Sequence, residues 1–174
     1  ISDRSQTYTY TSQGQEITEP MFGMFKRYEI DFDFISHMKG VCDDHNLLFT
    51  STPTGQKGID DLMRMGAPVL KNGSDYLTNL DFIRRLGETG LPVILSCGMS
   101  TLGDIDEAVR AFQETGNDRL ILLHCTSSYP TPSSDVHLRK IESLQQIFDM
   151  QVGFSDHTEG HVAGLLAASM GACM

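Results

Sequence analysis

The sequence has no apolar run long enough to cross a bilayer as a helix, and no pair of cysteines in a CxxC arrangement. Basic residues are scarce: 13 Lys and Arg face 23 Asp and Glu, which gives a formal net charge of −10. This balance argues against nucleic-acid binding, although one local lysine can still attract an anionic substrate. The scattered cysteines predict reduced thiols and a cytoplasmic protein; they are Cys42, Cys97, Cys125 and Cys173.

No GxGxxG motif follows an apolar segment, which argues against a dinucleotide-binding domain. The 174 residues are enough for one domain with a substantial core. Because the sequence begins Ile-Ser-Asp and ends within an apolar stretch, we interpret it as a fragment of a longer protein.

Residues 1–29 are poorly periodic and predict an irregular N-terminal segment: a loop and then a short helix around the apolar cluster at 21–25. A binding arm is the alternative. From residue 30 the pattern becomes regular. Asp31 is a plausible N-cap for the first helix, and Thr101 with Asp104 predicts a capping box for a later one.

Apolar strands alternate with helices at a spacing of about 25 residues, which is typical of a parallel α/β sheet. The predicted strands are residues 47–50, 67–70, 92–96, 120–124 and 151–155, and the predicted helices between and after them are 58–65, 77–86, 101–112, 136–148 and 160–170. An open doubly wound sheet and a (β/α)8 barrel both fit this pattern. Because a full barrel usually needs about 250 residues, about five units predict an incomplete barrel over residues 30–174.

Small hydroxyl residues follow every predicted strand, and a lysine and two histidines accompany them. Hydroxyls and glycine amides around a lysine can form a cradle for phosphate or carboxylate. The alternative is that these are ordinary loop residues. The segments concerned are residues 50–53, 71–75, 96–100, 124–130 and 155–157.

The histidines and the lysine each leave two interpretations open. Lys71 ends an apolar strand and either faces the mouth of the barrel or extends its amine to solvent. His157 follows a strand directly, so it is a candidate metal ligand or general acid/base. His124 lies within a strand and is expected to be buried and hydrogen-bonded.

Five motifs in this order closely resemble the sialic acid synthase family, which includes the N-acetylneuraminate, legionaminate and pseudaminate synthases. The resemblance runs from about Met21 to the end. It rests on Phe49-Thr50-Ser51-Thr52-Pro53, Lys71-Asn72-Gly73-Ser74, Ser96-Cys97-Gly98-Met99-Ser100, His124-Cys125-Thr126-Ser127-Ser128-Tyr129-Pro130 and Ser155-Asp156-His157-Thr158.

The resemblance implies a TIM barrel that condenses phosphoenolpyruvate with an N-acyl-mannosamine-type sugar to give a nine-carbon 2-keto sugar acid and phosphate. It further implies a Mn²⁺ or Mg²⁺ ion, a homodimer, and a C-terminal antifreeze-like domain that this sequence lacks. His157 would be a metal ligand, and Lys71, Tyr129 and His157 would be catalytic. The phosphoenolpyruvate would be held by Thr52, Lys71, Ser74, Ser96, Ser127, Tyr129 and Ser155.

The sequence departs from the family pattern at several positions. Asp75-Tyr76 replaces a usual Gly-Glu, Cys97 replaces a commoner Thr, and Ser127 stands where relatives often carry Asn. Two alternatives therefore stay open: a related phosphoenolpyruvate-dependent synthase that makes a shorter keto acid, and a degenerate barrel without catalysis.

Overall fold

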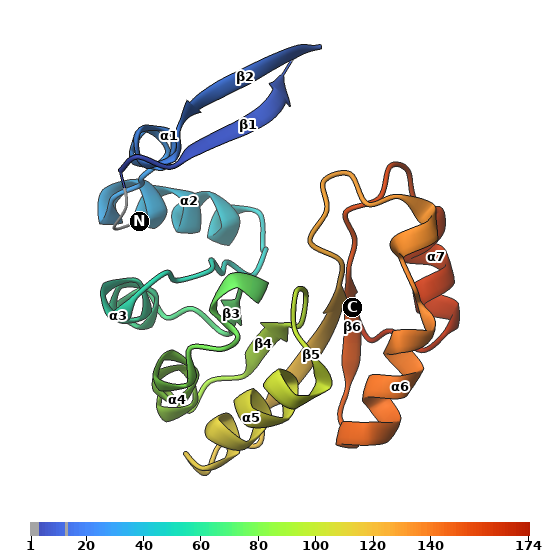
Figure 1. Ribbon diagram of the computed structural model, residues 1–174. Helices are drawn as coiled ribbons and strands as arrows, with labels where there is room; N and C mark the ends of the chain where they lie inside the picture. The colour runs from blue at the N-terminus through green and yellow to red at the C-terminus, as the bar shows by residue number, and fades with distance from the viewer. Residues whose placement is uncertain (1–3, 13) are drawn as a thin grey trace.

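The computed structural model describes residues 4–12 and 14–174 (Figure 1). The chain begins with a hairpin of β1 (Thr7–Ser12) and β2 (Gln15–Pro20), followed by α1 (Met21–Arg27), α2 (Phe32–Asp44) and α3 (Gln56–Arg64). Strands and helices then alternate: β3 (Leu70–Asn72), α4 (Leu80–Glu88), β4 (Val93–Ser96), α5 (Leu102–Gln113), β5 (Leu120–Cys125), α6 (Arg139–Phe148), β6 (Val152–Ser155) and α7 (Val162–Ser169).

Strands β3 to β6 form one parallel sheet in the order β3-β4-β5-β6, which is also their order in the sequence. A doubly wound sheet would reverse its strand order at a switch point, and this sheet does not. Helices α3, α4 and α5 lie along one side of the strand row, as Figure 1 shows. The fold is therefore an incomplete barrel of the α/β class, as the sequence predicts, with four parallel strands instead of five.

The register of the sheet gives its two faces different roles. In parallel strands, paired residues point to the same face, and alternate residues along a strand point to opposite faces. Leu70, Leu95, Leu122 and Val152 fall on one face and are fully buried. They form one core with the apolar stripes of the helices. The helix residues in this core include Ile59 and Leu62 of α3, Phe82 and Leu86 of α4, Phe112 of α5, and Ile141 and Leu144 of α6.

The opposite face of the sheet is the inside of the barrel. Ile94, Leu123 and Cys125 lie on it; they are buried too, but outside the helix-covered core. Gly153 on the same face allows close packing, because a Cβ at that position would lie 2.7 Å from Leu123 Cδ2. Lys71, Ser96 and Ser155 share this inner face by the same register.

The two predicted N-caps are confirmed. Asp31 accepts a hydrogen bond from the backbone N–H of Phe34 and begins α2. Thr101 and Asp104 form a capping box at the start of α5, with the Thr101 hydroxyl accepting from the Asp104 amide and the Asp104 carboxylate accepting from the Thr101 amide. The Thr101 hydroxyl also donates to the Asp104 carboxylate at 2.7 Å. This bond, together with the one from the Thr101 amide, holds the pKa of Asp104 below its usual value.

The prediction of an irregular loop before α1 is wrong. Strands β1 and β2 pair as an antiparallel hairpin, and the alternating Thr and Tyr residues of β1 suit a strand. Its base is tied to α1 because Glu19 accepts hydrogen bonds from Tyr10 and from both terminal nitrogens of Arg27. The expected short helix over the apolar cluster is confirmed as α1.

The predicted strand at residues 47–50 is also wrong. No strand is assigned there, and Leu47 and Leu48 are exposed. The segment is held beside β3 by a side-chain bond, since the Thr50 hydroxyl donates to the Val69 carbonyl oxygen at 2.5 Å. In α3, Ile59 and Leu62 are buried, whereas Met63 is exposed.

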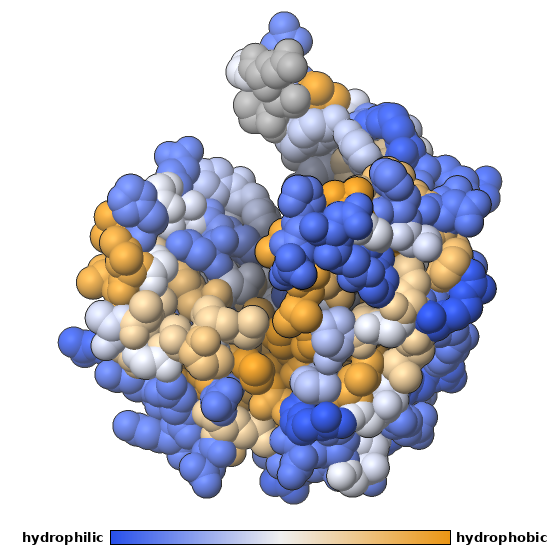
Figure 2. All heavy atoms as spheres, turned by 180° about the vertical axis from the view of Figure 1, so that it is seen from behind, coloured by the Kyte–Doolittle hydropathy of each residue, from blue (hydrophilic) through white to orange (hydrophobic). Residues whose placement is uncertain are grey.

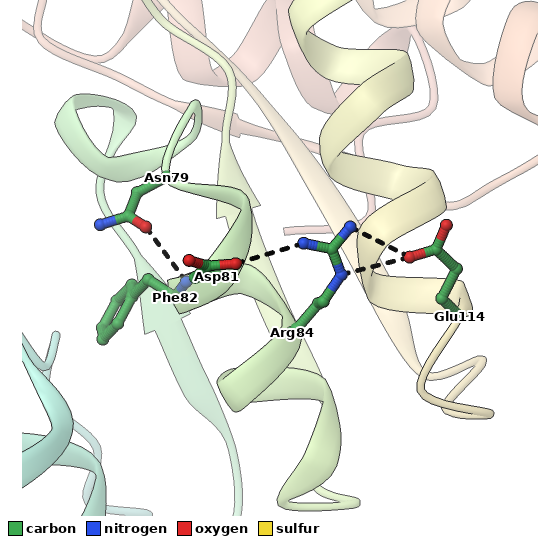
Figure 3. A network of polar contacts seen from close by, with 5 residues as sticks. All are labelled: Asn79, Asp81, Phe82, Arg84 and Glu114. Carbon is green, nitrogen blue, oxygen red and sulfur yellow. Dashed lines mark hydrogen bonds and ion pairs between the residues drawn. The ribbon is translucent and has the colours of Figure 1, made fainter.

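Polar contacts join α4 to α5 on the outer surface (Figure 3). Arg84 donates through two nitrogens to one oxygen of Glu114, at 3.1 and 3.2 Å, and Asn79 caps α4 by accepting from the Phe82 amide. Figure 2 shows the molecule from behind, with apolar residues gathered toward the middle of the face and hydrophilic ones around its outline. Among the described helices, none combines the length and apolar character required to cross a membrane.

We predict that the core on the helix side of the sheet dominates stability. Leu122→Ala should lower the free energy of unfolding by about 2–5 kcal/mol, because it leaves a cavity in the core. Arg84→Ala should cost about 1 kcal/mol or less, because the ion pair with Glu114 is exposed to solvent. Urea denaturation followed by circular dichroism measures both losses, and equal losses would contradict this account.

Candidate active site

Three predicted site residues share the inner face of the barrel at the carboxyl end of the sheet. Lys71 pairs with Ile94 in the register, Ser96 with Leu123, and Ser155 with Cys125. Lys71 is half-buried and makes no ion pair with any carboxylate that the structure describes. An ammonium group without an internal counterion is available to an anionic ligand.

Three rim loops converge around Gly98. The Gly98 amide donates to Ser74 Oγ at 2.9 Å, which leaves the Ser74 hydroxyl proton free to be donated elsewhere. A Cβ on Gly98 would lie 2.5 Å from Ser127 Oγ and 2.8 Å from Ser74 Oγ. A side chain at position 98 would force both hydroxyls to turn away, so glycine lets them meet there, where we expect one wall of the predicted cradle.

The Ser96 hydroxyl is buried and has no hydrogen-bond partner among the described residues. An unsatisfied buried hydroxyl costs roughly 1–3 kcal/mol, so such groups are rare unless something else binds them. Ser96 ends β4 on the inner face, beside the Gly98 turn. A ligand oxygen in the mouth of the barrel would supply the missing partner.

The ring of His157 is oriented by the backbone. Its Nδ1 lies 3.0 Å from the Thr126 carbonyl oxygen, which can only accept, so Nδ1 carries the proton. The Nε2 lone pair is therefore free to bind a metal ion or accept a proton. No cluster of three or more His, Cys, Asp or Glu side chains suited to a metal ion occurs in the described part of the chain. His157 would therefore be a single ligand from this segment.

Tyr129 stands on the rim with its ring against that of His157, at a centroid separation of 4.2 Å and an angle of 33°. Its side chain is largely exposed. Partial burial raises the pKa of the Tyr129 phenol, and the nearby Cys125, Asp75 and Tyr8 raise it further. Tyr129 is thus a protonated hydrogen-bond donor at neutral pH.

Two residues of the rim motifs point away from the mouth. His124 is buried on the outer face, where its Nε2 lies 2.6 Å from the Val136 carbonyl oxygen, and burial lowers its pKa. The expectation that His124 is buried and hydrogen-bonded is confirmed. Cys97 is buried in the core, which raises the pKa of its thiol to about 12. Because Cys97 faces the core, the presence of Cys instead of the commoner Thr does not change the side chains that line the mouth of the barrel.

No hydrogen bond within the described residues links Thr52 to the other candidate site residues. It is exposed on the loop before α3, and its side chain makes no hydrogen bond within the described residues. Asp156 accepts from the Thr158 amide at 2.8 Å, so it satisfies the local backbone. Sequence reasoning missed the Gly98 amide and the Thr126 carbonyl as parts of the site. The Gly98 amide could have been found from the sequence, because a glycine directly follows Ser96-Cys97 at the end of a predicted strand. No feature of the sequence points to the Thr126 carbonyl.

Comparisons with known proteins identify the family and the fold of the chain. The NeuB family model matches residues 1–174. An N,N'-diacetyllegionaminic acid synthase of Campylobacter jejuni is 33% identical, over 100% of this chain and 53% of that protein. An N-acetylneuraminate-9-phosphate synthase of Drosophila melanogaster is 29% identical, over 87% of this chain and 41% of that protein.

A solved structure of a sialic acid synthetase also matches the chain. The crystal structure of the N-acetylneuraminic acid synthetase of Leptospira borgpetersenii, in complex with citrate, matches with a TM-score of 0.83 and 32% identity, over 86% of this chain and 52% of that one. The chain thus spans about half the length of the relatives that it matches. Since the family model covers every residue, the chain belongs to the NeuB family of sialic acid synthases.

Proposed function

We propose that the protein containing this chain is a transferase that condenses phosphoenolpyruvate with an N-acyl-mannosamine-type sugar, to give a nine-carbon 2-keto sugar acid and phosphate. The observation that carries the proposal is the placement of Lys71, Ser96 and Ser155 on the same inner face of the barrel, toward the carboxyl ends of the strands. Ligands of barrels of this kind bind at that end of the strands.

The chemistry of this rim suits phosphoenolpyruvate, which carries a phosphate and a carboxylate. Lys71 would supply a positive charge, and hydroxyls around Gly98 would donate to the remaining oxygens. Ser96 would gain the hydrogen-bond partner that it lacks. Thr52 is the weakest member of the proposed set, because it is exposed and makes no hydrogen bond to the others within the described residues.

His157 fits a divalent metal ion, Mn²⁺ or Mg²⁺, through the Nε2 that its bond to Thr126 leaves free. Such an ion, when bound, acts as a Lewis acid that polarises a sugar aldehyde. In the proposed reaction, carbon 3 of phosphoenolpyruvate forms a bond to the aldehyde carbon. Water then adds at carbon 2 and phosphate leaves. Lys71 and the serines would hold the phosphate throughout, and the Tyr129 hydroxyl would donate to an oxygen at the rim.

The proposal also covers the sugar acceptor, the cellular location and the oligomeric state. A related synthase that makes a shorter keto acid would use the same cradle, so a screen of sugar acceptors separates the two. The four cysteines are free thiols in the structure, which supports a cytoplasmic protein. We also propose a homodimer. The two named relatives differ in whether their product carries a phosphate, so the charge of the acceptor is a separate question.

We predict that Lys71→Gln in the intact protein weakens phosphoenolpyruvate binding about 10- to 100-fold, because a charge-assisted hydrogen bond is lost. Lys57→Gln is the matched control, since Lys57 is exposed on α3 and pairs with Asp61. Calorimetry with phosphoenolpyruvate measures both, and equal affinities for the two variants would sink the proposed role of Lys71. No binding by the unmodified protein would favour a degenerate barrel.

A second prediction concerns the metal. His157→Gln should weaken Mn²⁺ binding by about 10-fold or more and reduce turnover with it, because one imidazole ligand is lost. His161→Gln, an exposed residue at the start of α7, should leave both unchanged. Electron paramagnetic resonance titration of Mn²⁺ measures the affinity independently of activity. Unchanged Mn²⁺ affinity in His157→Gln would remove this residue from the metal site.

A further inference from the structure

Thr131 is a buried polar residue in the loop between β5 and α6, and the proposed site does not yet use it. Its side chain is only 6% exposed. Its hydroxyl donates to the Ser128 carbonyl oxygen at 2.8 Å and also contacts the Thr126 carbonyl oxygen at 3.2 Å. Because a hydroxyl has one proton, the two carbonyls share it, and the shorter bond to Ser128 is the stronger one. The Thr131 hydroxyl therefore holds the loop 126–131 closed from inside.

The same residue ties this loop to His157. The Thr131 amide donates to the His157 carbonyl oxygen at 2.8 Å. The Thr126 carbonyl oxygen, which the Thr131 hydroxyl contacts, is also the acceptor of the His157 Nδ1 proton at 3.0 Å. Thr131 thus holds the backbone of His157 directly, and it holds the acceptor of the His157 ring through the closed loop.

Two other groups contact the imidazole, and neither fixes its tautomer as the carbonyl does. The Tyr129 ring lies against it at 4.2 Å between centroids, which restrains the tilt of the ring but makes no bond to a particular nitrogen. Cys125 Sγ lies 4.0 Å from His157 Nδ1, and sulfur is only a weak acceptor. In a neutral imidazole the bond made by one nitrogen decides the state of the other. The position of the Thr126 carbonyl therefore decides whether Nε2 has a free lone pair.

We propose that Thr131 is a positioning residue for His157: its hydroxyl holds the loop that carries the Thr126 carbonyl, which keeps the imidazole proton on Nδ1 and leaves Nε2 free for a divalent cation. The part of this inference that concerns the cation rests on the proposed function and deepens it. Partners that orient a metal-bound histidine typically contribute about 10- to 100-fold to metal affinity. Because Thr131 acts through the carbonyl, we expect the lower end of that range.

The test removes the hydroxyl in the intact protein and measures the tautomer and the metal affinity separately. Thr131→Val keeps nearly the same volume and the amide bond to His157, so it tests the hydroxyl alone. In metal-free protein with isotope-labelled histidine, NMR in alkaline buffer should find the His157 proton on Nδ1 in the unmodified protein and partly on Nε2 in Thr131→Val. His157→Gln identifies the signal. Electron paramagnetic resonance should show Mn²⁺ affinity about 10-fold weaker in Thr131→Val.

Two control variants separate this role from a general loss of stability. Thr131→Ser keeps the hydroxyl and should match the unmodified protein in both measurements. Thr89→Val removes a hydroxyl that donates to the Leu86 carbonyl oxygen at 2.6 Å, where α4 ends and before β4 begins. It should change neither the tautomer nor the Mn²⁺ affinity. Thr131→Ala removes the same hydroxyl as Thr131→Val and gives the same answer if the valine variant does not fold.

The outcomes distinguish this inference from the proposed function. An unchanged tautomer in Thr131→Val and Thr131→Ala, or an equal change in Thr89→Val, would overturn the role of Thr131 and leave the proposed function intact. Absence of Mn²⁺ binding by the unmodified protein would instead overturn the metal site of the proposed function. The tautomer is measured without metal, so it decides the role of Thr131 in that case as well.

Discussion

The parallel register of β3 to β6 is the constraint on which the rest of the structure depends. It assigns Leu70, Leu95, Leu122 and Val152 to the face that the helices cover, and their burial forms the core. The same register turns Lys71, Ser96 and Ser155 to the other face. A slip of one residue in any strand would exchange the two sets, burying polar groups in the core. Stability and the candidate site are therefore set by the same hydrogen-bond ladder.

Much of this arrangement could be predicted from the sequence, because continuous apolar strands and periodic helices are strong local patterns. The cap at Asp31 and the capping box at Thr101 are examples, since each needs only residues three apart. The segment at residues 47–50 has the same apolar appearance as a strand but lacks the backbone ladder. Whether a ladder forms depends on which neighbours the fold provides, and local sequence does not contain that information.

The hairpin and the fine structure of the site were less predictable for related reasons. The alternating Thr and Tyr residues of β1 pair with β2, but so polar a pattern resembles a loop. In the rim motifs, His124 lies within a predicted strand and His157 directly follows one, so the sequence already favours burial for His124 and chemistry for His157. The register turns His124 outward to the Val136 carbonyl, whereas the Thr126 carbonyl holds His157 in the mouth. Which carbonyl oxygen each ring contacts depends on the fold and has no local signal in the sequence.

Within the described part of the chain, the proposed cradle accounts together for a Lys71 without an ion pair, a buried Ser96 hydroxyl without a partner, and a glycine at position 98 beside two serine hydroxyls. The most direct test is a crystal structure of the intact protein with phosphoenolpyruvate. The account predicts the phosphate or the carboxylate about 3 Å from Lys71 Nζ on the inner face of the sheet, with Ser96 Oγ bonded to the ligand. Phosphoenolpyruvate bound elsewhere, with Lys71 still free, would contradict it.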